Sequence, residues 1–436
     1  MNKLKKVPLK GSEEGAHKVF RDFGQSLPVK INRVKIDSKQ EFPLVKFSSW
    51  LKYLIEYDEL DRLAGTSDLK SMENVLRTFW SRYRVCNPDH MMFHGNCGAA
   101  LHPERTIPLV HHGDEGRSKK KKQVMILAST PVLGQGSSRV QHDHSDVSEE
   151  NPLNLNFLGD TYLTHFLSAV LPISLYNEQP ESFHQVLAVL AEDFRQLFDE
   201  GLLVEGKRFY ISVLGCKGDA PYLVKAGRFE RSFLRRPVQR SSKKPSTGIC
   251  HLCLAGRENH TFDVPFEEYG VEHPAWLATV GQEKPNQIPS EFEIIPFLKD
   301  GAEEGMEQFF QFDLFHNLHL GLGKSFAASA VCLCMELINE SISGAFETLT
   351  RDFQKYCQKN HESPYHKKLS ASLFGVEGGF HELPDAAWNK GDYTRLILQW
   401  FADYCAREVV GKTENPLYLV CVACLPEINN VSTHVL

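Results

Sequence analysis

The order of apolar segments in the first half of the chain predicts an α/β fold with a mixed sheet and flanking helices. Short aliphatic runs, typical of buried strands, come before and after one long segment whose apolar residues line a single helical face. In chain order, the segments are strands at 107–112 and 124–128, a strand or helix at 166–176, a helix at 180–203 and a strand at 209–214. Helices that alternate with strands in this way pack on the faces of a sheet.

The remaining regions differ in composition. Residues 1–40 are basic and polar, which is typical of a flexible arm. Residues 41–100 carry apolar side chains at spacings of three and four, which indicates a helical N-terminal region. We expect residues 101–235 to hold the first part of the α/β core, residues 236–325 to form an insertion, and residues 326–436 to form a helical C-terminal region.

The composition fits a soluble globular protein of two or three domains. Of the 436 residues, 42% are hydrophobic and 24% are charged. The formal net charge of −6 argues weakly against a nucleic-acid-binding protein, because phosphate binding needs clustered Lys and Arg. The basic residues do cluster, however, and one group comprises Arg228, Arg231, Arg235, Arg236, Arg240, Lys243 and Lys244. A mildly acidic protein can therefore still carry a basic groove.

The eleven cysteines indicate reduced thiols in an intracellular protein. Their number is odd, and no apolar run follows the lysines of the N-terminal sequence MNKLKKVPLK, as a secretory signal would require. No run approaches the roughly 18 uncharged apolar residues that a membrane span needs. We therefore expect no association with a membrane.

Two aspartates follow predicted strands, each directly after a glycine. Asp114 lies in the segment HHGDEG and Asp219 in the segment GCKGDAP. Local structure explains each one alone: a turn at Asp114, and a helix N-cap with an early proline at Asp219. As a pair at the ends of strands, where α/β sheets build their sites, they supply the carboxylate oxygens that Mg²⁺ prefers. Two-metal phosphodiester chemistry needs such ligands.

Cys250 and Cys253 have the C-x-x-C spacing of one half of a zinc site. Two further soft ligands are needed, and His316 and His319, in the segment DLFHNLH, complete a Cys₂His₂ set. The competing histidines are His251, His260 and His273. A redox role for the cysteines and core positions for the histidines are the alternatives.

The order of these motifs resembles the transposases of CACTA-type (En/Spm-like) elements and their relatives. In that family an early Asp follows the first strand, a second Asp follows a later strand, and C-x-x-C and Asp-x-x-His motifs come after it. The matching residues here are Asp114, Asp219, Cys250 with Cys253, and Asp313 with His316, within residues 100–340. No G-x-S-x-G, Walker A or dinucleotide-binding motif supports a different class of enzyme.

The resemblance implies an RNase H-like fold with a DDE/D active site. In that family Mg²⁺ or Mn²⁺ supports DNA cleavage and strand joining, and water and then a 3′-hydroxyl attack a phosphodiester. The catalytic acids here would be Asp114, Asp219 and Glu336, and Zn²⁺ would stabilise the insertion. The resemblance also implies a nuclear protein whose partner is DNA, as transposon ends and target, and it is compatible with a homo-oligomer.

The third acid is expected on a helix after the second Asp. Glu336 fits best, because it lies on the predicted helix at 326–342, 17 residues beyond His319. Glu340 lies one turn further along the same face, and Asp392 is a more distant alternative. The expected DNA contacts after Asp219 are Arg228, Arg231, Arg235, Arg236, Lys243 and Lys244, with Lys119 to Lys122 as a second path.

A non-catalytic relative is the main competing interpretation. No zinc finger or helix-turn-helix is recognisable before residue 100. The chain would then be an inactive or fragmentary transposase-derived module, stabilised by zinc, that binds DNA or protein. A third interpretation is an α/β protein whose motif matches are accidental. Convergence of Asp114, Asp219 and Glu336 would distinguish the enzyme from both.

Overall fold

The computed structural model describes most of the chain and divides it into two compact units. The described residues are 6–8, 12–24, 26–36, 41–117, 122–134, 165–232, 246–258 and 264–428, apart from 269, 303–304, 380–383, 412, 416–417, 420 and 427. Unit 1 is Met1–Gln311 and unit 2 is Phe312–Leu436. Each unit has its own cluster of buried hydrophobic side chains.

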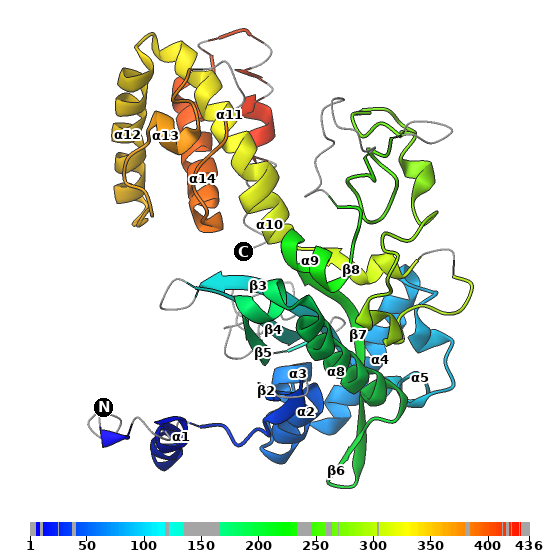
Figure 1. The fold of residues 1–436 in the computed structure, drawn as a ribbon. Helices are drawn as coiled ribbons and strands as arrows, with labels where there is room; N and C mark the ends of the chain where they lie inside the picture. The colour runs from blue at the N-terminus through cyan, green and yellow to red at the C-terminus, as the bar shows by residue number, and fades with distance from the viewer. Residues whose placement is uncertain are drawn as a thin grey trace. The chain divides into compact units, whose positions relative to one another are not determined.

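Unit 1 is built on a mixed sheet, which has six strands within the described residues (Figure 1). The strands are β3 (Thr106–Arg117), β4 (Gln123–Pro131), β5 (Phe166–Pro172), β6 (Leu202–Val204), β7 (Lys207–Gly218) and β8 (Phe310–Phe312). Their order is β5-β4-β3-β7-β6, with β8 also paired to β7. The first three form an antiparallel meander, and β7 lies parallel to β3 on its other side. This confirms the predicted α/β fold and its mixed sheet.

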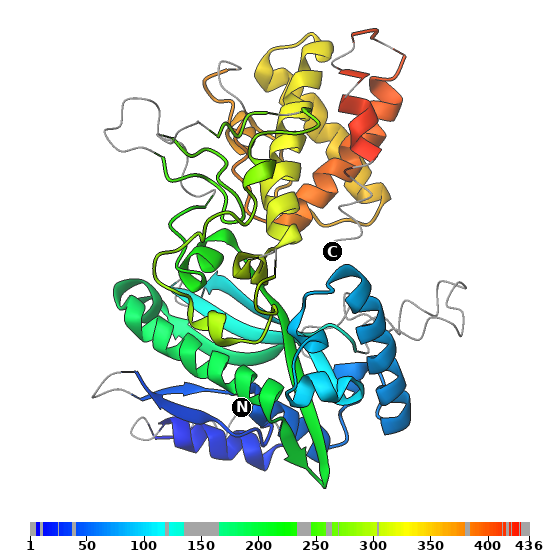
Figure 2. The ribbon, with the colours of Figure 1, turned by 90° about the vertical axis from the view of Figure 1, so that its right-hand side faces the viewer.

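One long helix, α8 (Pro180–Asp199), connects β5 to the β6–β7 hairpin and lies across the sheet (Figures 1 and 2). Its buried face includes Val186, Leu190 and Phe194, as the helical spacing of the sequence predicts. The ambiguous segment before it begins as the strand β5 and ends in a short π-helical turn, Ser174–Glu178. The flanking helices of the predicted fold are therefore present.

The N-terminal part of unit 1 contains more regular structure than a flexible arm. Its helices are α1 (Ser12–Asp22), α2 (Phe47–Glu56), α3 (Asp61–Ala64), α4 (Leu69–Cys86) and α5 (Gly98–Leu101). Strands β1 (Asn32–Lys35) and β2 (Glu41–Leu44) form a small antiparallel sheet. Between α9 (Ala220–Ala226) and β8, the described residues form short 3₁₀ turns at Leu277–Thr279, Glu291–Ile294 and Met306–Phe309.

Unit 2 is helical in its described residues. It contains α10 (Leu314–Asn317), α11 (Gly323–Met335), α12 (Ile342–Lys359), α13 (Ala371–Phe374) and α14 (Gly391–Glu408), and Figure 1 shows α11, α12 and α14 side by side. The helical run Leu314–Ile338 is long and apolar enough to cross a membrane by length and composition alone. Core helices of soluble proteins meet the same test, and 44% of its most apolar window is buried within the protein.

Candidate functional site

Two glycines fix the geometry at the last paired position of the parallel strands β3 and β7. Gly113 pairs with Gly218 across the two strands. A Cβ atom on Gly113 would lie 2.2 Å from the ring of Tyr222, and one on Gly218 would lie 2.5 Å from the same ring. Only glycine therefore lets Tyr222, a fully buried residue of α9, pack over both strands at this position.

Asp114 and Asp219 directly follow this glycine pair. The register of the two parallel strands shifts between Leu109 and His111, and beyond the shift Gly113 lies opposite Gly218. The two aspartates therefore occupy the same step along neighbouring strands. The two strands are neighbours in the sheet. The expectation that Asp114 follows the end of its strand is wrong, however, because β3 continues to Arg117, where Asp114 still pairs with Ile126 of β4.

The side chain of Asp114 lies on the open face of the sheet. Residues paired across strands share a face, which places Asp114 in a row with Ile126 and Val170. These two apolar neighbours are 38% and 44% exposed. Solvent and a solute can therefore reach this row.

Asp219 has a structural role as the N-cap of α9. One of its carboxylate oxygens accepts a hydrogen bond of 2.8 Å from the backbone N–H of Tyr222, and Pro221 follows at an early helical position. The local explanation considered for the sequence is therefore correct. An ionised carboxylate has about four acceptor sites, so the capping bond does not exhaust it.

Glu115 and Tyr176 are polar residues at this end of the sheet that sequence reasoning did not select. The Tyr176 hydroxyl donates a short hydrogen bond to the Glu115 carboxylate. Burial raises the pKa of Tyr176, as do Glu115 and the negative charge of Asp219. Alternation along β3 puts Glu115 on the face opposite Asp114. The sequence feature that could have identified Glu115 is its position directly after Asp114 in the segment HHGDEG.

The candidates for the third acid all lie in unit 2. Glu336 is exposed, just beyond the end of α11, and accepts a hydrogen bond of 2.8 Å from the Tyr418 hydroxyl. Glu340 does not share a helix with it, because Asn339 adopts a left-handed conformation that ends the helix. Asp392, in the first turn of α14, pairs with Arg395 at 2.8 Å. The prediction that Glu336 and Glu340 share one helical face is therefore wrong.

The predicted zinc ligands belong to two different units. Cys250 and Cys253, in unit 1, contact each other, and the hydrogen bond from the Cys253 thiol lowers the pKa of Cys250 to about 6. The same bond raises the pKa of Cys253. Within the part of the chain that the structure describes, no group of three or more His, Cys, Asp or Glu side chains has an arrangement suited to a metal ion.

The two predicted histidine ligands lie in unit 2. His316 Nδ1 lies 2.8 Å from a carboxylate oxygen of Asp313, which also caps α10. His319 is fully buried against the Phe315 ring. Of the competing histidines, His251 hydrogen-bonds the Phe310 carbonyl at 2.9 Å, and burial lowers its pKa to about 4. His260 lies outside the described residues.

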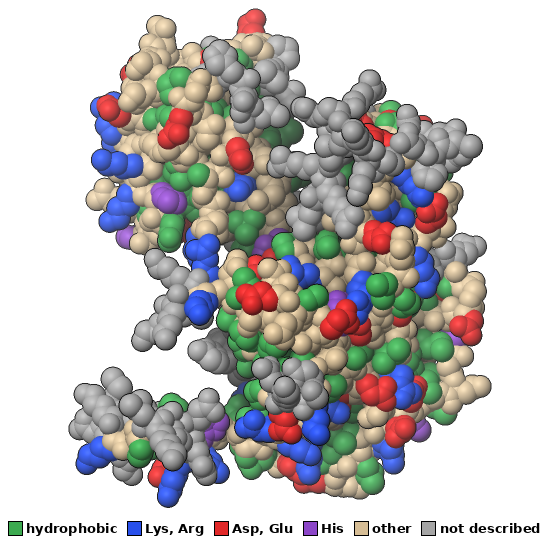
Figure 3. All heavy atoms as spheres, in the orientation of Figure 1, with side chains coloured by type: hydrophobic (Ala, Val, Ile, Leu, Met, Phe, Trp, Pro, Cys, Tyr) green, Lys and Arg blue, Asp and Glu red, His purple; other side chains and the backbone are tan. Residues whose placement is uncertain are grey.

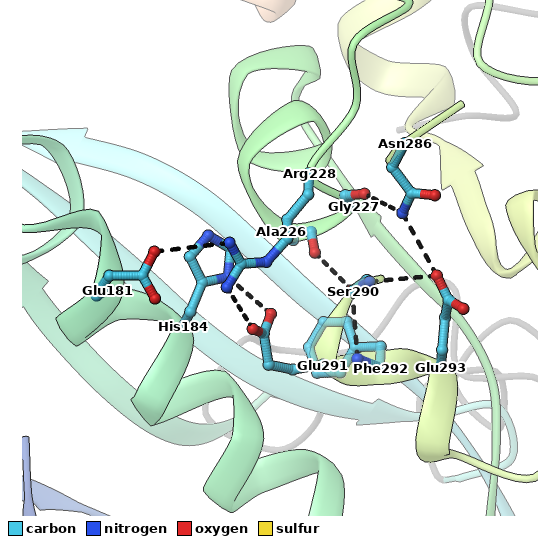
Figure 4. Close-up of polar contacts among 10 residues, drawn as sticks. All are labelled: Glu181, His184, Ala226, Gly227, Arg228, Asn286, Ser290, Glu291, Phe292 and Glu293. Carbon is cyan, nitrogen blue, oxygen red and sulfur yellow. Dashed lines mark hydrogen bonds and ion pairs between the residues drawn. The ribbon is translucent and has the colours of Figure 1, made fainter. Parts of the chain in front are cut away.

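Arg228 contributes to a polar network between α8 and the turn Glu291–Ile294 (Figure 4). Its guanidinium donates to one Glu291 oxygen at 2.6 Å, while His184 Nδ1 lies 2.7 Å from the other. Burial opposes charge on Glu291, but the two hydrogen bonds outweigh it and lower the pKa of that carboxyl. This expected DNA contact therefore has an intramolecular carboxylate partner.

The same turn holds the C-terminal end of α9. Ser290 Oγ donates to the Ala226 carbonyl at 2.7 Å, and Asn286 donates to the Gly227 carbonyl at 2.9 Å (Figure 4). Asp219 caps the other end of this helix. Both ends of α9, and with them the position of Asp219, are thus fixed by polar contacts.

Arg231 is buried and bonded to backbone carbonyls. It is 5% exposed, and its nitrogens donate to the carbonyls of Cys250, Glu283 and Lys284 at 3.2, 2.6 and 3.2 Å. The other expected DNA contacts, Arg235, Arg236, Lys243 and Lys244, lie outside the described residues. On the face that Figure 3 shows, basic and acidic side chains are interspersed. Through these hydrogen bonds Arg231 connects the segment of the cysteine pair to the segment at Glu283 and Lys284.

Two buried histidines in unit 1 make the fold sensitive to acid. Burial lowers the pKa of His90 and of His111, which lies on β3, to about 3 from the ordinary histidine value of 6.5. At a pH between the folded and the ordinary pKa, these histidines bind protons in the unfolded chain but not in the folded chain. The free energy of unfolding should therefore fall with decreasing pH below about 6.5, by about 1.4 kcal/mol per pH unit for each histidine.

Urea titrations between neutral and mildly acidic pH measure this dependence. His111→Leu should remove one histidine's share of the slope, because the ring packs between Phe194 and Phe292 without titrating. His273→Leu, at an exposed position, is the matched control and should keep the full slope. An equal slope in the His111 variant and the wild type would contradict the assignment.

No protein-family model, curated protein or solved structure matches this chain in the comparisons made.

Proposed function

We propose that this chain is a transposase-like protein that cleaves and joins DNA strands with the help of divalent metal ions. The observation that carries the proposal is the parallel pairing of β3 and β7, in which Gly113 lies opposite Gly218 and each glycine is followed by an aspartate. Neighbouring strands lie about 4.8 Å apart, which is the scale of a site that holds two metal ions about 4 Å apart.

The strand order supports an RNase H-like core. An antiparallel meander of β3, β4 and β5 is followed by the crossover helix α8 and by β7, which returns parallel to β3. A fold of this kind brings the first and fourth strands of its core side by side. Asp114, within β3, and Asp219, directly after β7, are the acids at neighbouring positions of these two strands.

The two carboxylates also have the chemistry of a shared site. One Asp219 oxygen accepts the hydrogen bond from the Tyr222 N–H, and a carboxylate has further acceptor positions. Two carboxylates at one step provide the hard oxygen ligands that Mg²⁺ and Mn²⁺ prefer.

In this proposal Asp114 and Asp219 hold the metal ions. Helix α9, whose Tyr222 packs over Gly113 and Gly218, keeps Asp219 in place. The bound ions would supply positive charge to the phosphodiester and acidify a water molecule or a 3′-hydroxyl. The third acid that the resemblance implies, Glu336, belongs to unit 2. The proposed setting is the nucleus, with DNA as partner.

Nicking of supercoiled plasmid DNA by the purified full chain tests the proposed activity. We expect conversion to the open circular form in MgCl₂ or MnCl₂ and none with EDTA. The same preparation without added metal, after dialysis against EDTA, is the control for contaminating metal. Failure to nick in both metals would contradict the proposed enzyme.

We also propose that Cys250 and Cys253 bind a structural Zn²⁺. The pair fits zinc chemically, because the thiols contact each other and one of them has a lowered pKa, which favours the thiolate that binds metal. His316 and His319, the remaining ligands expected from the sequence, belong to unit 2. Metal analysis should give about one zinc per chain, lost in a Cys250→Ser, Cys253→Ser variant.

The control for the zinc measurement is a Cys86→Ser, Cys424→Ser variant, which removes two exposed thiols from other parts of the chain. It should keep its zinc. Unchanged zinc content in the Cys250, Cys253 variant would reject these ligands.

A non-catalytic DNA-binding module is the second candidate. The hydrogen bonds of Asp219 to α9 and of Glu336 to Tyr418 favour it, since they give both acids a structural reason to be present. This candidate predicts DNA binding with no nicking in either metal. The plasmid assay, combined with a binding assay in EDTA, therefore separates the two candidates.

A further inference from the structure

A pocket of about 370 Å³ opens beside α4 in unit 1. Three of its polar lining residues, Arg77, Ser81 and Arg84, come from this helix. They lie four and three residues apart, so their side chains emerge on one helical face. The pocket therefore has one wall with two guanidinium groups and a hydroxyl.

The floor of the pocket is aromatic and is held in place by the core. Trp80 is 2% exposed, and its indole N–H donates to the Thr106 carbonyl at 2.9 Å. Phe93 packs edge-on against Trp80, with ring centroids 6.3 Å apart. Because these rings are anchored, an aromatic ligand would meet a preformed surface rather than one it must order.

The charge of the pocket is positive. Among the described residues neither Arg77 nor Arg84 forms an ion pair, and no acidic side chain lines the pocket. The Arg84 guanidinium lies 5.5 Å from the centre of the Phe93 ring. By contrast Arg105, two residues after the lining residue Pro103, forms an ion pair with Glu73. The two pocket arginines are thus available to an anion.

We propose that this pocket binds one nucleotide of a single DNA strand, with a phosphate between Arg77 and Arg84 and the base against Phe93. The planar fork of arginine matches phosphate oxygens, and aromatic side chains bind unstacked bases of any sequence. A base within a duplex could not reach Phe93. The choice of DNA as the ligand rests on the proposed function.

The pocket offers cations for DNA in place of the two described arginines of the predicted basic segment, which already have partners within the protein. Arg228 is paired with Glu291, and Arg231 is bonded to three carbonyls. In this proposal the phosphate contacts come instead from α4, which precedes Asp114 in the sequence. A strand end held there would be separated from the duplex.

Fluorescence anisotropy of a short labelled oligothymidine, titrated with the full chain in EDTA at several salt concentrations, tests the pocket. For Arg77→Gln, Arg84→Gln we expect the log–log salt slope to shrink by about 0.7, the contribution of the one phosphate that the two arginines hold on a single strand. Phe93→Ala should weaken binding by about 5- to 150-fold, the range for loss of one stacked base.

The charge-matched control is Arg33→Gln, Lys35→Gln, which removes two exposed cations from β1. It should keep the wild-type salt slope. Equal slopes for the pocket variant and this control would overturn the proposal. Displacement of the probe by poly-glutamate at lower concentrations than by unlabelled oligothymidine would also overturn it and assign the pocket to an acidic protein.

The outcomes separate this proposal from the proposed function. Binding in EDTA does not depend on metal at Asp114 and Asp219. Oligothymidine binding that requires Arg77 and Arg84, without any plasmid nicking, would support the pocket and contradict the enzyme. Nicking together with binding that is indifferent to both arginines would support the enzyme and overturn the pocket.

Discussion

Asp219→Asn and Asp219→Ser should abolish most metal-dependent nicking while leaving the protein as stable as the wild type. Asp, Asn and Ser cap helices about equally well, so each variant keeps the hydrogen bond to the start of α9. Only the carboxylate is a charged oxygen ligand for Mg²⁺. Loss of several kcal/mol of metal-dependent stabilisation corresponds to a decrease in the nicking rate of about 100-fold or more. Asp114→Asn should have a similar effect.

The chain contains a matched control for this experiment. Asp68 caps α4 in the same way, accepting a hydrogen bond of 2.8 Å from the Ser71 N–H. Asp68→Asn therefore makes the same chemical change at an equivalent helix terminus, and it should leave nicking unchanged. Asp219→Ala separates the two roles of Asp219, because it should also lose about 1 kcal/mol of stability through the missing cap.

Two results would contradict this assignment. If Asp219→Ser nicks DNA as fast as the wild type, Asp219 is only a helix cap. If Asp219→Asn loses activity together with its thermal stability, the loss reports unfolding rather than a missing ligand. Circular dichroism melting curves of all the aspartate variants, recorded beside the nicking rates, distinguish these outcomes.

The sequence was sufficient to predict three strands of the sheet and α8, because these segments carry their own local patterns. Aliphatic runs marked β3, β4 and β7, and apolar residues at helical spacing marked α8. The extent of β3 could not be predicted in this way. Its last residues, through Arg117, are polar and glycine-rich, and they are strand only because they pair with β4. Pairing between strands is not encoded in the local period of one strand.

The candidate site was predicted in part. The strand–Gly–Asp repeat had a visible physical reason, and the packing of Tyr222 over both glycines explains it. The end of the helix after Glu336 could have been anticipated, because Asn339 is a residue that tolerates the left-handed conformation of a helix C-terminus. The role of Arg231 could not, because nothing in its neighbourhood of basic residues distinguishes a buried arginine from an exposed one.

Arg231→Met should destabilise unit 1 strongly. The guanidinium donates to the carbonyls of Cys250, Glu283 and Lys284 in a place that is 5% exposed. Methionine keeps much of the volume but leaves three acceptors without their donor. An unsatisfied buried acceptor costs about 1–3 kcal/mol. Because these three bonds are only partly buried, we expect a total loss of about 1–3 kcal/mol in the free energy of unfolding. Urea denaturation of the full chain measures it.

Lys284→Met is the control for this prediction, because it removes a neighbouring cation whose side chain is 67% exposed and paired with Glu293. An exposed ion pair is worth less than about 1 kcal/mol, so its unfolding curve should stay close to that of the wild type. The salt dependence of DNA binding decides between the two roles of Arg231. A variant that keeps full stability but loses one phosphate contact would restore Arg231 as a DNA ligand. The variant can instead be less stable while its folded fraction binds DNA with an unchanged salt slope. That result would establish Arg231 as a structural residue that connects the cysteine pair to the segment at Glu283 and Lys284.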